Sequence, residues 1–546
     1  MAASLNAPAR RVRGIRSLVS RAGGAAPTRA ETLLSMLSAA LLVLAFPDFE
    51  LWPLAWVGLV PLLFAVGRRA HAGRAFLLGW MTGTLFFYAS CYWLTHPMIH
   101  YAGIPAWLAY PLLLPAALAG GLFPALCAGA LARSCVRWGA RALLLAPLFW
   151  VSLEWARLGA VGQLWNAVGY SQAYVPPLIQ GARFGGVYLV GFLVVCVNAA
   201  LAYALLEHGR RAALTSAGAL AAVALAVVGF DMAPPPTVER EPRALVVAVQ
   251  PNVIPDFERP AAETARLAEE HFEMSARALD ALDADRPGGG LPRVVVWPES
   301  PMNFSFARDA RFREQASGFA RARRASLLFN SLEPAPDGGA YNAAVLVNEE
   351  GRLAVQYDKI RLMPFGEYVP LPRWLPGAGM VRGVVGEFTP GTRYTLMPLG
   401  GADTGAPRAG VFICLESAYP HITRQFAGEG ADVLIEITND AYQGDTAILR
   451  QHMANAVFRA VETGRPLLRV TNTGLTARID ERGRVLDLAG KNRQEVRTWP
   501  VARSAGGETF YVKRGDGFVA ACSFASFLAL LLTYVPWLRR RIKAQS

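Results

Sequence analysis

The sequence has few charged residues. Aspartate, glutamate, lysine and arginine make up only 17% of its 546 residues, whereas hydrophobic residues make up 53%. Long uncharged runs at this hydrophobicity are typical of an integral membrane protein. The net charge of +13 would by itself suggest a nucleic-acid partner. The arginines, however, cluster between apolar runs, so we expect no nucleic-acid partner and relate the charge to membrane topology.

Cysteine is also scarce, and its placement is uneven. Of the six cysteines, five lie in or beside apolar runs, and Cys414 alone lies in the long water-compatible part of the chain. A single cysteine excludes a disulfide within that part. The sequence has no CxxC, no HExxH and no histidine cluster, so we expect no metal site. Because it also lacks a P-loop and a GxGxxG in a strand-to-helix setting, we expect no cofactor.

Eight apolar runs are candidate membrane spans, the first two of them short. They lie near residues 31–46, 51–67, 75–94, 104–132, 141–158, 184–205, 212–232 and 518–538. The fourth contains Gly120, Gly121 and Pro124, where we expect a kink. No clear small-x-small cleavage site follows the first run, so we interpret it as a retained span rather than a signal peptide.

Basic residues alternate between loops and thereby predict the topology. They are Arg10, Arg11, Arg13, Arg16, Arg21 and Arg29 before the first run, then Arg68, Arg69 and Arg74, then Arg133, Arg137 and Arg141, then Arg210 and Arg211, and finally Arg539, Arg540, Arg541 and Lys543. The positive-inside rule places both termini in the cytoplasm. We therefore expect a basic N-terminus (1–30), a seven-span domain (31–232), a domain on the far side (233–517), a last span (518–538) and a basic tail (539–546).

The far-side region alternates strand and helix patterns. It follows a proline linker at Pro234–Pro236, and a glycine-rich turn is expected at residues 286–290. Helix 446–463 has Gly464 at the position that ends a helix and Pro466 just beyond. Apolar strands alternating with helices indicate sheets covered by helices. Periodicity alone does not distinguish a doubly wound sheet from a sandwich of two sheets.

Three stretches place reactive side chains at predicted strand ends. Cys414 ends a buried strand in GVFICLESAYP, Glu299 ends another in RVVVWPES, and YDKIRLMPFGEYVP contains Lys359 and Glu367. A lone cysteine is most often a small core residue. The three stretches together supply a base, a cation and a nucleophile, which is the set that covalent catalysis requires.

WPES, YDKxxLxPFGEYVP and ICLE, in this order, resemble the motifs around the Glu-Lys-Cys triad of the carbon–nitrogen hydrolase (nitrilase) superfamily. PFGEYVP, ITND at residues 437–440 and the run 451–474 are similar to its membrane branch, the apolipoprotein N-acyltransferases. The resemblance covers roughly the whole chain. It implies an integral membrane α-helical bundle joined to a nitrilase-like α-β-β-α sandwich. It further implies the bacterial inner membrane, with the catalytic domain (233–517) in the periplasm.

Applied to this chain, the resemblance also implies roles at the site. Glu299 is the expected base and Cys414 the nucleophile, while Lys359 and the N–H of Leu415 are the expected oxyanion donors. Leu415 itself departs from the family, whose members often carry an aromatic residue there. Residues 441–444 depart too, because they lack the usual Trp-Phe pair.

Further acidic and amide residues match the family beside its triad. Glu367 and Glu416 are expected to orient Lys359 and the substrate amine, with a structural ion pair as the alternative. Asn439 and Asp440 are expected to brace the site, with a plain turn as the alternative.

The implied activity is acyl transfer from a phospholipid to the α-amine of a diacylglyceryl-modified N-terminal cysteine of an apolipoprotein. It would proceed through a thioester on Cys414 in a monomeric enzyme. One alternative is a membrane-anchored amidase that releases its acyl group to water. Another is a catalytically inactive binding or transport protein, against which the intact triad argues.

Overall fold

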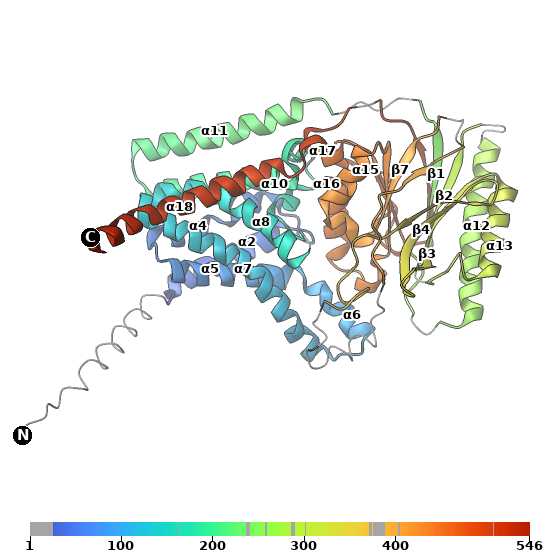
Figure 1. Cartoon of the computed structure of the whole chain (residues 1–546), viewed down its shortest axis with the longest axis horizontal. Helices are drawn as coiled ribbons and strands as arrows, with labels where there is room; N and C mark the ends of the chain where they lie inside the picture. The colour runs from blue at the N-terminus through green and yellow to red at the C-terminus, as the bar shows by residue number, and fades with distance from the viewer. Residues whose placement is uncertain are drawn as a thin grey trace, which may run out of the picture.

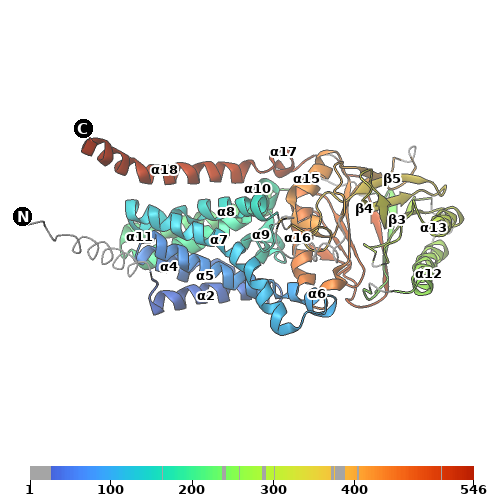
Figure 2. The same ribbon diagram turned by 60° about the horizontal axis from the view of Figure 1, so that its bottom comes forward.

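The computed structural model places a helical bundle at one end of the molecule and an α/β domain at the other (Figures 1 and 2). It describes residues 26–162, 164–235, 241–256, 259–285, 290–300, 302–370, 374, 388–401, 405–505 and 507–545, with side chains up to residue 535. Most of the predicted basic N-terminus, the last residue of the proline linker and residues 286–289 of the predicted turn lie outside these ranges. So do the side chains of the basic tail.

The bundle contains a helix at each of the eight predicted runs. Its helices are α2 (Arg29–Ala45), α3 (Ala55–Gly58), α4 (Val60–Arg68), α5 (Ala72–Ser90), α6 (Thr95–His100), α7 (Ala106–Trp138), α8 (Ala146–Val161), α9 (Pro176–Ile179), α10 (Ala182–Leu206), α11 (Arg210–Met232) and α18 (Gly517–Gln545). Four described stretches are long and apolar enough to cross a membrane, namely 106–161, 182–206, 210–232 and 517–535. The first contains both α7 and α8, whereas α2, α4 and α5 are shorter or less apolar.

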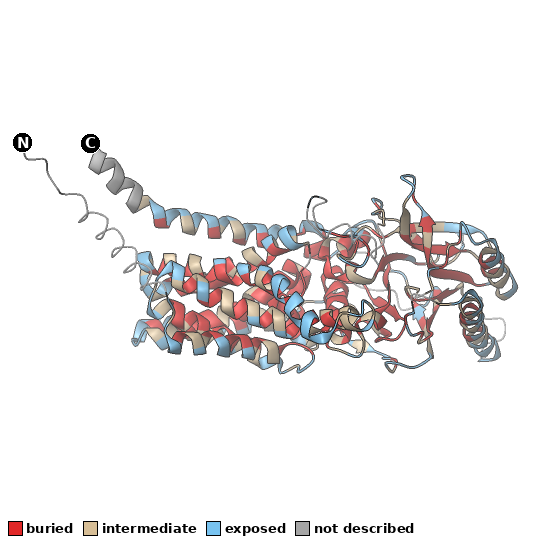
Figure 3. Cartoon of the chain, turned by 90° about the horizontal axis from the view of Figure 1, so that it is seen from below, coloured by how far each residue is buried: buried red, intermediate tan, exposed pale blue. Residues whose placement is uncertain are grey.

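Helices α11 and α18 run along the edge of the bundle (Figure 1), and exposed positions follow one another along α18 (Figure 3). Leu225 on α11 is 73% exposed, and Phe524 on α18 is 70% exposed. The outer faces of these long helices are apolar, and the backbone groups are hydrogen-bonded within each helix. Both features are compatible with contact with lipid chains.

Helix α7 continues without a break through the predicted kink, with three prolines inside it. Its glycines allow close packing against α5. A Cβ atom at Gly121 would lie 2.8 Å from the backbone nitrogen of Thr84, and one at Gly83 would lie 2.9 Å from the Cα of Gly121. Small residues of this kind let two helix backbones approach inside a membrane protein.

The α/β domain is a sandwich of two six-stranded sheets. One sheet has the order β12-β1-β2-β3-β4-β5 and the other β11-β10-β9-β8-β7-β6. The strands of the first are β1 (Ala244–Gln250), β2 (Arg293–Val296), β3 (Ser326–Pro334), β4 (Ala340–Val347), β5 (Leu353–Asp358) and β12 (Glu495–Val501). Those of the second are β6 (Leu396–Pro398), β7 (Arg408–Ile413), β8 (Val433–Thr438), β9 (Leu467–Thr471), β10 (Ala477–Ile479) and β11 (Val485–Leu486).

Helices cover the outer face of each sheet. Helices α12 (Ala261–Asp285) and α13 (Ala310–Arg323) cover the first, while α15 (Pro420–Gly428) and α16 (Ile448–Thr463) cover the second, on the side that faces the bundle (Figure 1). A short helix, α17 (Phe510–Arg514), leads into α18. The α-β-β-α arrangement expected from the resemblance is therefore confirmed, and the doubly wound sheet is excluded.

Helix α16 joins the two halves of the molecule. Every one of its residues except Arg450 is buried, because one face packs on the second sheet and the other on the bundle. At its start, the Gln451 side chain accepts hydrogen bonds from the indoles of Trp93 (3.0 Å) and Trp165 (2.9 Å) and donates to the carbonyls of Pro47 (2.8 Å) and Ser90 (2.9 Å). A buried amide with all its partners fixes one relative position of the two halves.

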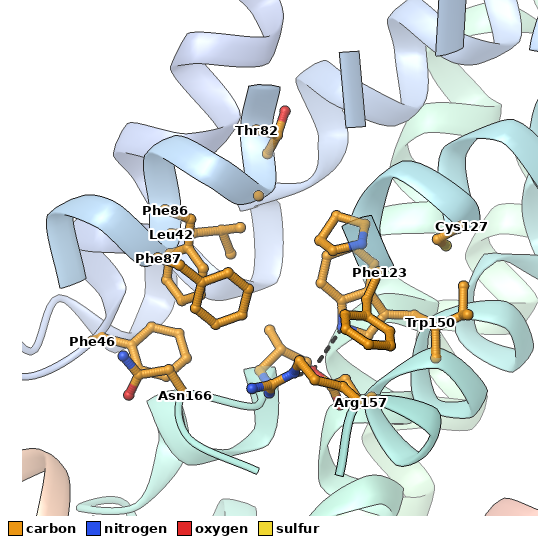
Figure 4. A pocket seen from close by; sticks show the side chains of 15 residues that line it. Leu42, Phe46, Thr82, Phe86, Phe87, Phe123, Cys127, Trp150, Arg157 and Asn166 are labelled. Atoms are coloured by element: carbon orange, nitrogen blue, oxygen red, sulfur yellow. Dashed lines mark hydrogen bonds between the residues drawn. The ribbon is translucent and has the colours of Figure 1, made fainter. Parts of the chain in front are cut away.

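The bundle itself contains a pocket lined by aromatic and aliphatic side chains of α2, α5, α7 and α8 (Figure 4). Thr82, Glu154, Arg157 and Asn166 contribute its polar groups. The cavity has a volume of about 30 Å³, which accommodates water but no acyl chain. The side chains that the sequence predicts to be reactive lie elsewhere, at the strand ends of the sandwich.

The contact between α5 and α7 generates a stability prediction. Gly121→Ala places a methyl group against the α5 backbone, so we expect a lower melting temperature, at a cost of about 1–3 kcal/mol from overpacking. Gly129→Ala on the same helix is the matched control, because its new Cβ would meet nothing closer than 3.7 Å. That variant should melt at or above the wild-type temperature, and equal melting of the two variants in detergent would contradict the packing role of Gly121.

Candidate active site

Cys414 occupies a strained turn at the end of a strand that is buried from Ala409 onward. It directly follows β7 and begins a short 3-10 turn, η6 (Cys414–Ala418). Its φ angle is 53°, in the left-handed region that non-glycine residues seldom adopt. Such a conformation costs about 1–3 kcal/mol and persists only where neighbouring contacts enforce it. The turn therefore fixes where the thiol stands.

Glu299 follows β2 of the other sheet, three residues after the strand ends. One carboxylate oxygen accepts hydrogen bonds from the Asn342 side chain (3.0 Å) and the Lys359 ammonium (3.3 Å). The other accepts from the backbone N–H of Asn439, at the end of β8 (3.2 Å). The carboxylate thus lies where the ends of the two sheets meet, and 14% of its side chain remains exposed.

Lys359 follows β5 and is buried, with 1% of its surface exposed. Its ammonium donates to Glu367 (2.9 Å) as well as to Glu299 (3.3 Å). Burial alone would lower the pKa of Lys359, but the carboxylates of Glu299 and Glu367 together raise it well above the usual value. The site therefore holds a permanent cation.

Glu367 orients this lysine. Its second oxygen accepts from the backbone N–H of Met363 (2.7 Å), and Asn342 donates to its first oxygen (2.5 Å). Asn342, on β4, was not singled out from the sequence. Its amide bridges the two carboxylates that flank the ammonium, so it separates two like charges that would otherwise repel each other.

Glu416 does not hydrogen-bond to Lys359, in contrast to its expected role. It is fully buried, and its carboxylate accepts from the backbone N–H groups of Ile360 and Ile413 (2.8 Å each) and from the hydroxyl of Tyr357 (2.8 Å). Burial raises the pKa of Glu416, and these hydrogen bonds oppose that rise. The residue ties the turn after β5 to the turn after β7 and so holds the lysine and cysteine segments together.

The thiol of Cys414 is protonated in the resting enzyme. Burial raises its pKa well above the usual value, the charge of Glu299 adds to the rise, and Lys359 opposes it. A nucleophile in this state needs a base to remove its proton. Glu299 accepts a hydrogen bond from the ammonium and acts on the thiol through its charge, and 14% of its side chain is exposed.

The remaining predicted residues lie at the rim. Asn439 caps η7 (Asp440–Gln443), and its side-chain oxygen accepts from Asn472 (3.0 Å), so it braces the β8 end. Leu415 is the second residue of η6. Its N–H belongs to the first turn, where helical N–H groups lack an intrahelical partner. Tyr442, in the stretch that departs from the family, packs its ring 5.7 Å from that of Tyr101 in the bundle.

Sequence reasoning missed a buried charge cluster beneath Cys414. Glu436 on β8 and Arg469 on β9 are in register, and their side chains form an ion pair (2.5 Å). Asp440 pairs with the same arginine (2.6 Å) and with His452 on α16 (2.7 Å). A signal was available, because VLIEIT and LLRVT each carry one charge of opposite sign inside an apolar strand.

Comparison with known proteins agrees with the motifs. Residues 38–200 match the family described as apolipoprotein N-acyltransferase N-terminal domain, and residues 290–510 match carbon-nitrogen hydrolase. An apolipoprotein N-acyltransferase of Geobacter metallireducens is 32% identical over 93% of this chain and 96% of its own length. The chain belongs to the apolipoprotein N-acyltransferase family. A member from Allorhizobium ampelinum is 31% identical over 84% of each chain.

Among solved structures, an amidase of the nitrilase superfamily from Nesterenkonia covers 52% of this chain and 98% of its own. Its sequence identity is 18% and its TM-score 0.37. The resemblance to the apolipoprotein N-acyltransferase family stated from the sequence is confirmed by the relatives of full length. The roles of individual site residues stay predictions.

The bridging amide of Asn342 generates a test. Asn342→Asp adds a third carboxylate beside Glu299 and Glu367, which should raise the pKa of Cys414 further. One pKa unit lowers the thiolate fraction tenfold, so we expect alkylation of Cys414 by iodoacetamide at pH 8 to slow by about tenfold or more. Peptide mass spectrometry measures the rate at this cysteine.

Asn348→Asp is the matched control, since Asn348 lies at the β4–β5 hairpin and its side-chain oxygen only accepts from Arg352 (2.9 Å). Its alkylation rate should equal that of the wild type. An unchanged rate in Asn342→Asp would show that Asn342 does not set the charge balance of the site.

Proposed function

We propose that this chain transfers an acyl group from a phospholipid to the α-amine of the diacylglyceryl-modified N-terminal cysteine of an apolipoprotein. The observation that carries the proposal is the convergence of Glu299, Lys359 and Cys414 from the strand ends of two sheets, in a chain similar over 93% of its length to a named apolipoprotein N-acyltransferase. The acyl group would pass through a thioester on Cys414, in two half-reactions.

In the first half-reaction, Glu299 takes the thiol proton as the sulfur of Cys414 attacks the ester carbonyl of the phospholipid. The negative charge that develops on the carbonyl oxygen is stabilised by the Lys359 ammonium and the N–H of Leu415. When the carbonyl re-forms, the ester C–O bond breaks, and the leaving oxygen takes the proton from Glu299. A lysophospholipid departs and the thioester remains.

In the second half-reaction, the neutral α-amine attacks the thioester carbonyl, and Glu299 takes a proton from the nitrogen. The C–S bond breaks, the amide is released, and the proton on Glu299 returns to the sulfur of Cys414. The same carboxylate therefore serves both steps, first for a thiol and then for an amine, with Lys359 and Leu415 as common oxyanion donors.

We further propose the domain boundaries and the orientation. Residues 31–232 and 518–538 would lie in the bacterial inner membrane as eight spans, and residues 233–517 would lie in the periplasm. The basic segments 1–30 and 539–546 would be cytoplasmic. The lipid donor and the lipidated acceptor both stay in the bilayer, which accounts for a catalytic domain fixed to a bundle, and a monomer contains every residue that the mechanism uses.

The orientation predicts the result of reporter fusions at two positions. Gly209 precedes α11 and Pro336 lies in the turn after β3. An alkaline phosphatase fused at Pro336 should be active, because the enzyme folds only in an oxidising compartment, and one fused at Gly209 should be inactive. Activity at both positions, or at neither, would contradict the eight-span topology.

The thioester predicts a mass change. Phospholipid alone should add one acyl group to the wild-type enzyme, labile to neutral hydroxylamine, with release of lysophospholipid. Glu299→Gln should block this loading, because it removes the base and keeps the shape of the side chain. When a diacylglyceryl-cysteine peptide is added to the loaded wild type, the acyl group should leave Cys414 and appear as an amide on the peptide. Intact-mass measurement after rapid quench follows each step.

Cys414→Ala is the negative control and should gain no mass. If water removed the acyl group from Cys414 as fast as the peptide does, the result would support the membrane-anchored amidase instead. A wild-type enzyme that transfers the acyl group without ever gaining mass would refute the covalent mechanism.

A further inference from the structure

His452, on α16, is a fully buried histidine that hydrogen-bonds to the backbone of the nucleophile. Its Nε2 lies 3.1 Å from the carbonyl oxygen of Cys414, and its Nδ1 lies 2.7 Å from a carboxylate oxygen of Asp440. Glu436 lies 3.1 Å from the same Nε2 as an ion-pair partner. Every polar neighbour of the ring is thus an acceptor. A neutral imidazole has one N–H and could satisfy only one side.

The carboxylates cannot supply the missing proton, because Arg469 keeps them ionised. Its guanidinium contacts Glu436 (2.5 Å) and Asp440 (2.6 Å), and all four residues are at most 2% exposed. With a protonated histidine the cluster has two negative and two positive charges and is neutral. With a neutral histidine it would carry one uncompensated buried negative charge, which is costly.

We infer that His452 is a positioning residue, held as an imidazolium, whose Nε2–H bond to the Cys414 carbonyl fixes the left-handed turn that presents the thiol. The inference rests on the proposed function, because it assigns Cys414 as the nucleophile. Besides His452, the serine hydroxyl of Ser417 donates to the same carbonyl (3.3 Å). His452 supplies the shorter contact, and its ring is immobilised from both sides.

The contacts that hold His452 in place extend into the bundle. The ring of Trp165 lies 5.7 Å from the imidazole, and the Trp165 indole donates to Gln451, the residue preceding His452. The turn that holds the nucleophile is therefore supported through α16 by a residue of the membrane half.

The charge of His452 should make both the stability and the rate of the protein depend on pH. Burial and Arg469 would lower the pKa of His452, but Asp440 and Glu436 raise it to about 9, from 6.5 for an ordinary histidine. A folded-state pKa above the unfolded value gives stability that is complete below pH 6.5 and is lost as the pH rises toward 9. A neutral ring that keeps its single N–H on Nδ1, toward the charged Asp440, loses the bond to Cys414, so the rate of thioester formation should fall above about pH 9.

Two substitutions separate the two contacts of the ring. His452→Gln places an amide donor near the Nε2 position and can keep the bond to Cys414, whereas His452→Asn reaches only the Nδ1 position and keeps the bond to Asp440. Both remove the same charge. Misplacement of a nucleophile costs about 100-fold, so we expect acyl loading of His452→Asn to slow by about that factor with little change in the phospholipid KM. His452→Gln should retain most of the rate and lose the fall above pH 9.

His271→Gln is the matched control. His271 is another fully buried histidine, on α12, with a pKa lowered by burial to about 4. Its substitution should lower stability without changing the loading rate per folded molecule. Equal rates in His452→Asn and His452→Gln, once corrected for the folded fraction, would overturn the positioning role. Failure of the wild type both to load and to transfer an acyl group would refute the proposed function instead.

A measurement on the unaltered protein does not depend on folding of the variants. Nitrogen NMR of histidine-labelled enzyme in detergent distinguishes a ring with two N–H groups from a ring with one. At pH 7, His452 should show two and His271 one, with the His452 signals assigned by their loss in the variants. A neutral His452 at pH 7 would overturn the inference.

Discussion

The active site depends on one buried ammonium. Lys359 has no access to water, so its charge is tolerable only because Glu299 and Glu367 flank it. Those two carboxylates in turn lie close together only because the ammonium and the Asn342 amide stand between them. Removal of Lys359 leaves two carboxylates facing each other, and removal of Asn342 takes away the amide that lies between them. In either case the carboxylates repel each other and the geometry of the site is no longer supported.

A second set of buried charges, on the other sheet, is also paired. Glu436, Asp440, His452 and Arg469 neutralise one another beneath Cys414, whereas Lys359 beside it is flanked by two carboxylates. Cys414 thus lies between two groups of paired buried charges, one from each sheet. Paired charges in fixed positions provide electrostatic stabilisation without reorganisation, which is the property that acyl transfer requires.

Much of this arrangement could be predicted from the sequence, for a physical reason. Reactive residues at the ends of buried strands, such as Glu299 after β2 and Cys414 after β7, meet wherever the strand ends meet. What could not be predicted depends on pairing across the sheets. The opposition of Glu436 and Arg469 becomes visible only once β8 and β9 are in register. Glu416 points to backbone N–H groups rather than to the lysine, and backbone donors have no sequence signature. The spans were clear where the helices are long, as in α10 and α11, and unclear where α2 and α4 are short.

Helix α16 also sets a distance. Because it is buried between the second sheet and the bundle, the two are separated by one helix, about 10–12 Å across with its side chains. On the proposed function, a substrate anchored by its acyl chains has to raise its reacting carbonyl or amine by only about that length to meet the strand ends. The width of the helix would then select substrates by length. A reactive group close to its lipid anchor would reach the thiol, whereas one far along a tethered chain would lie beyond the thiol.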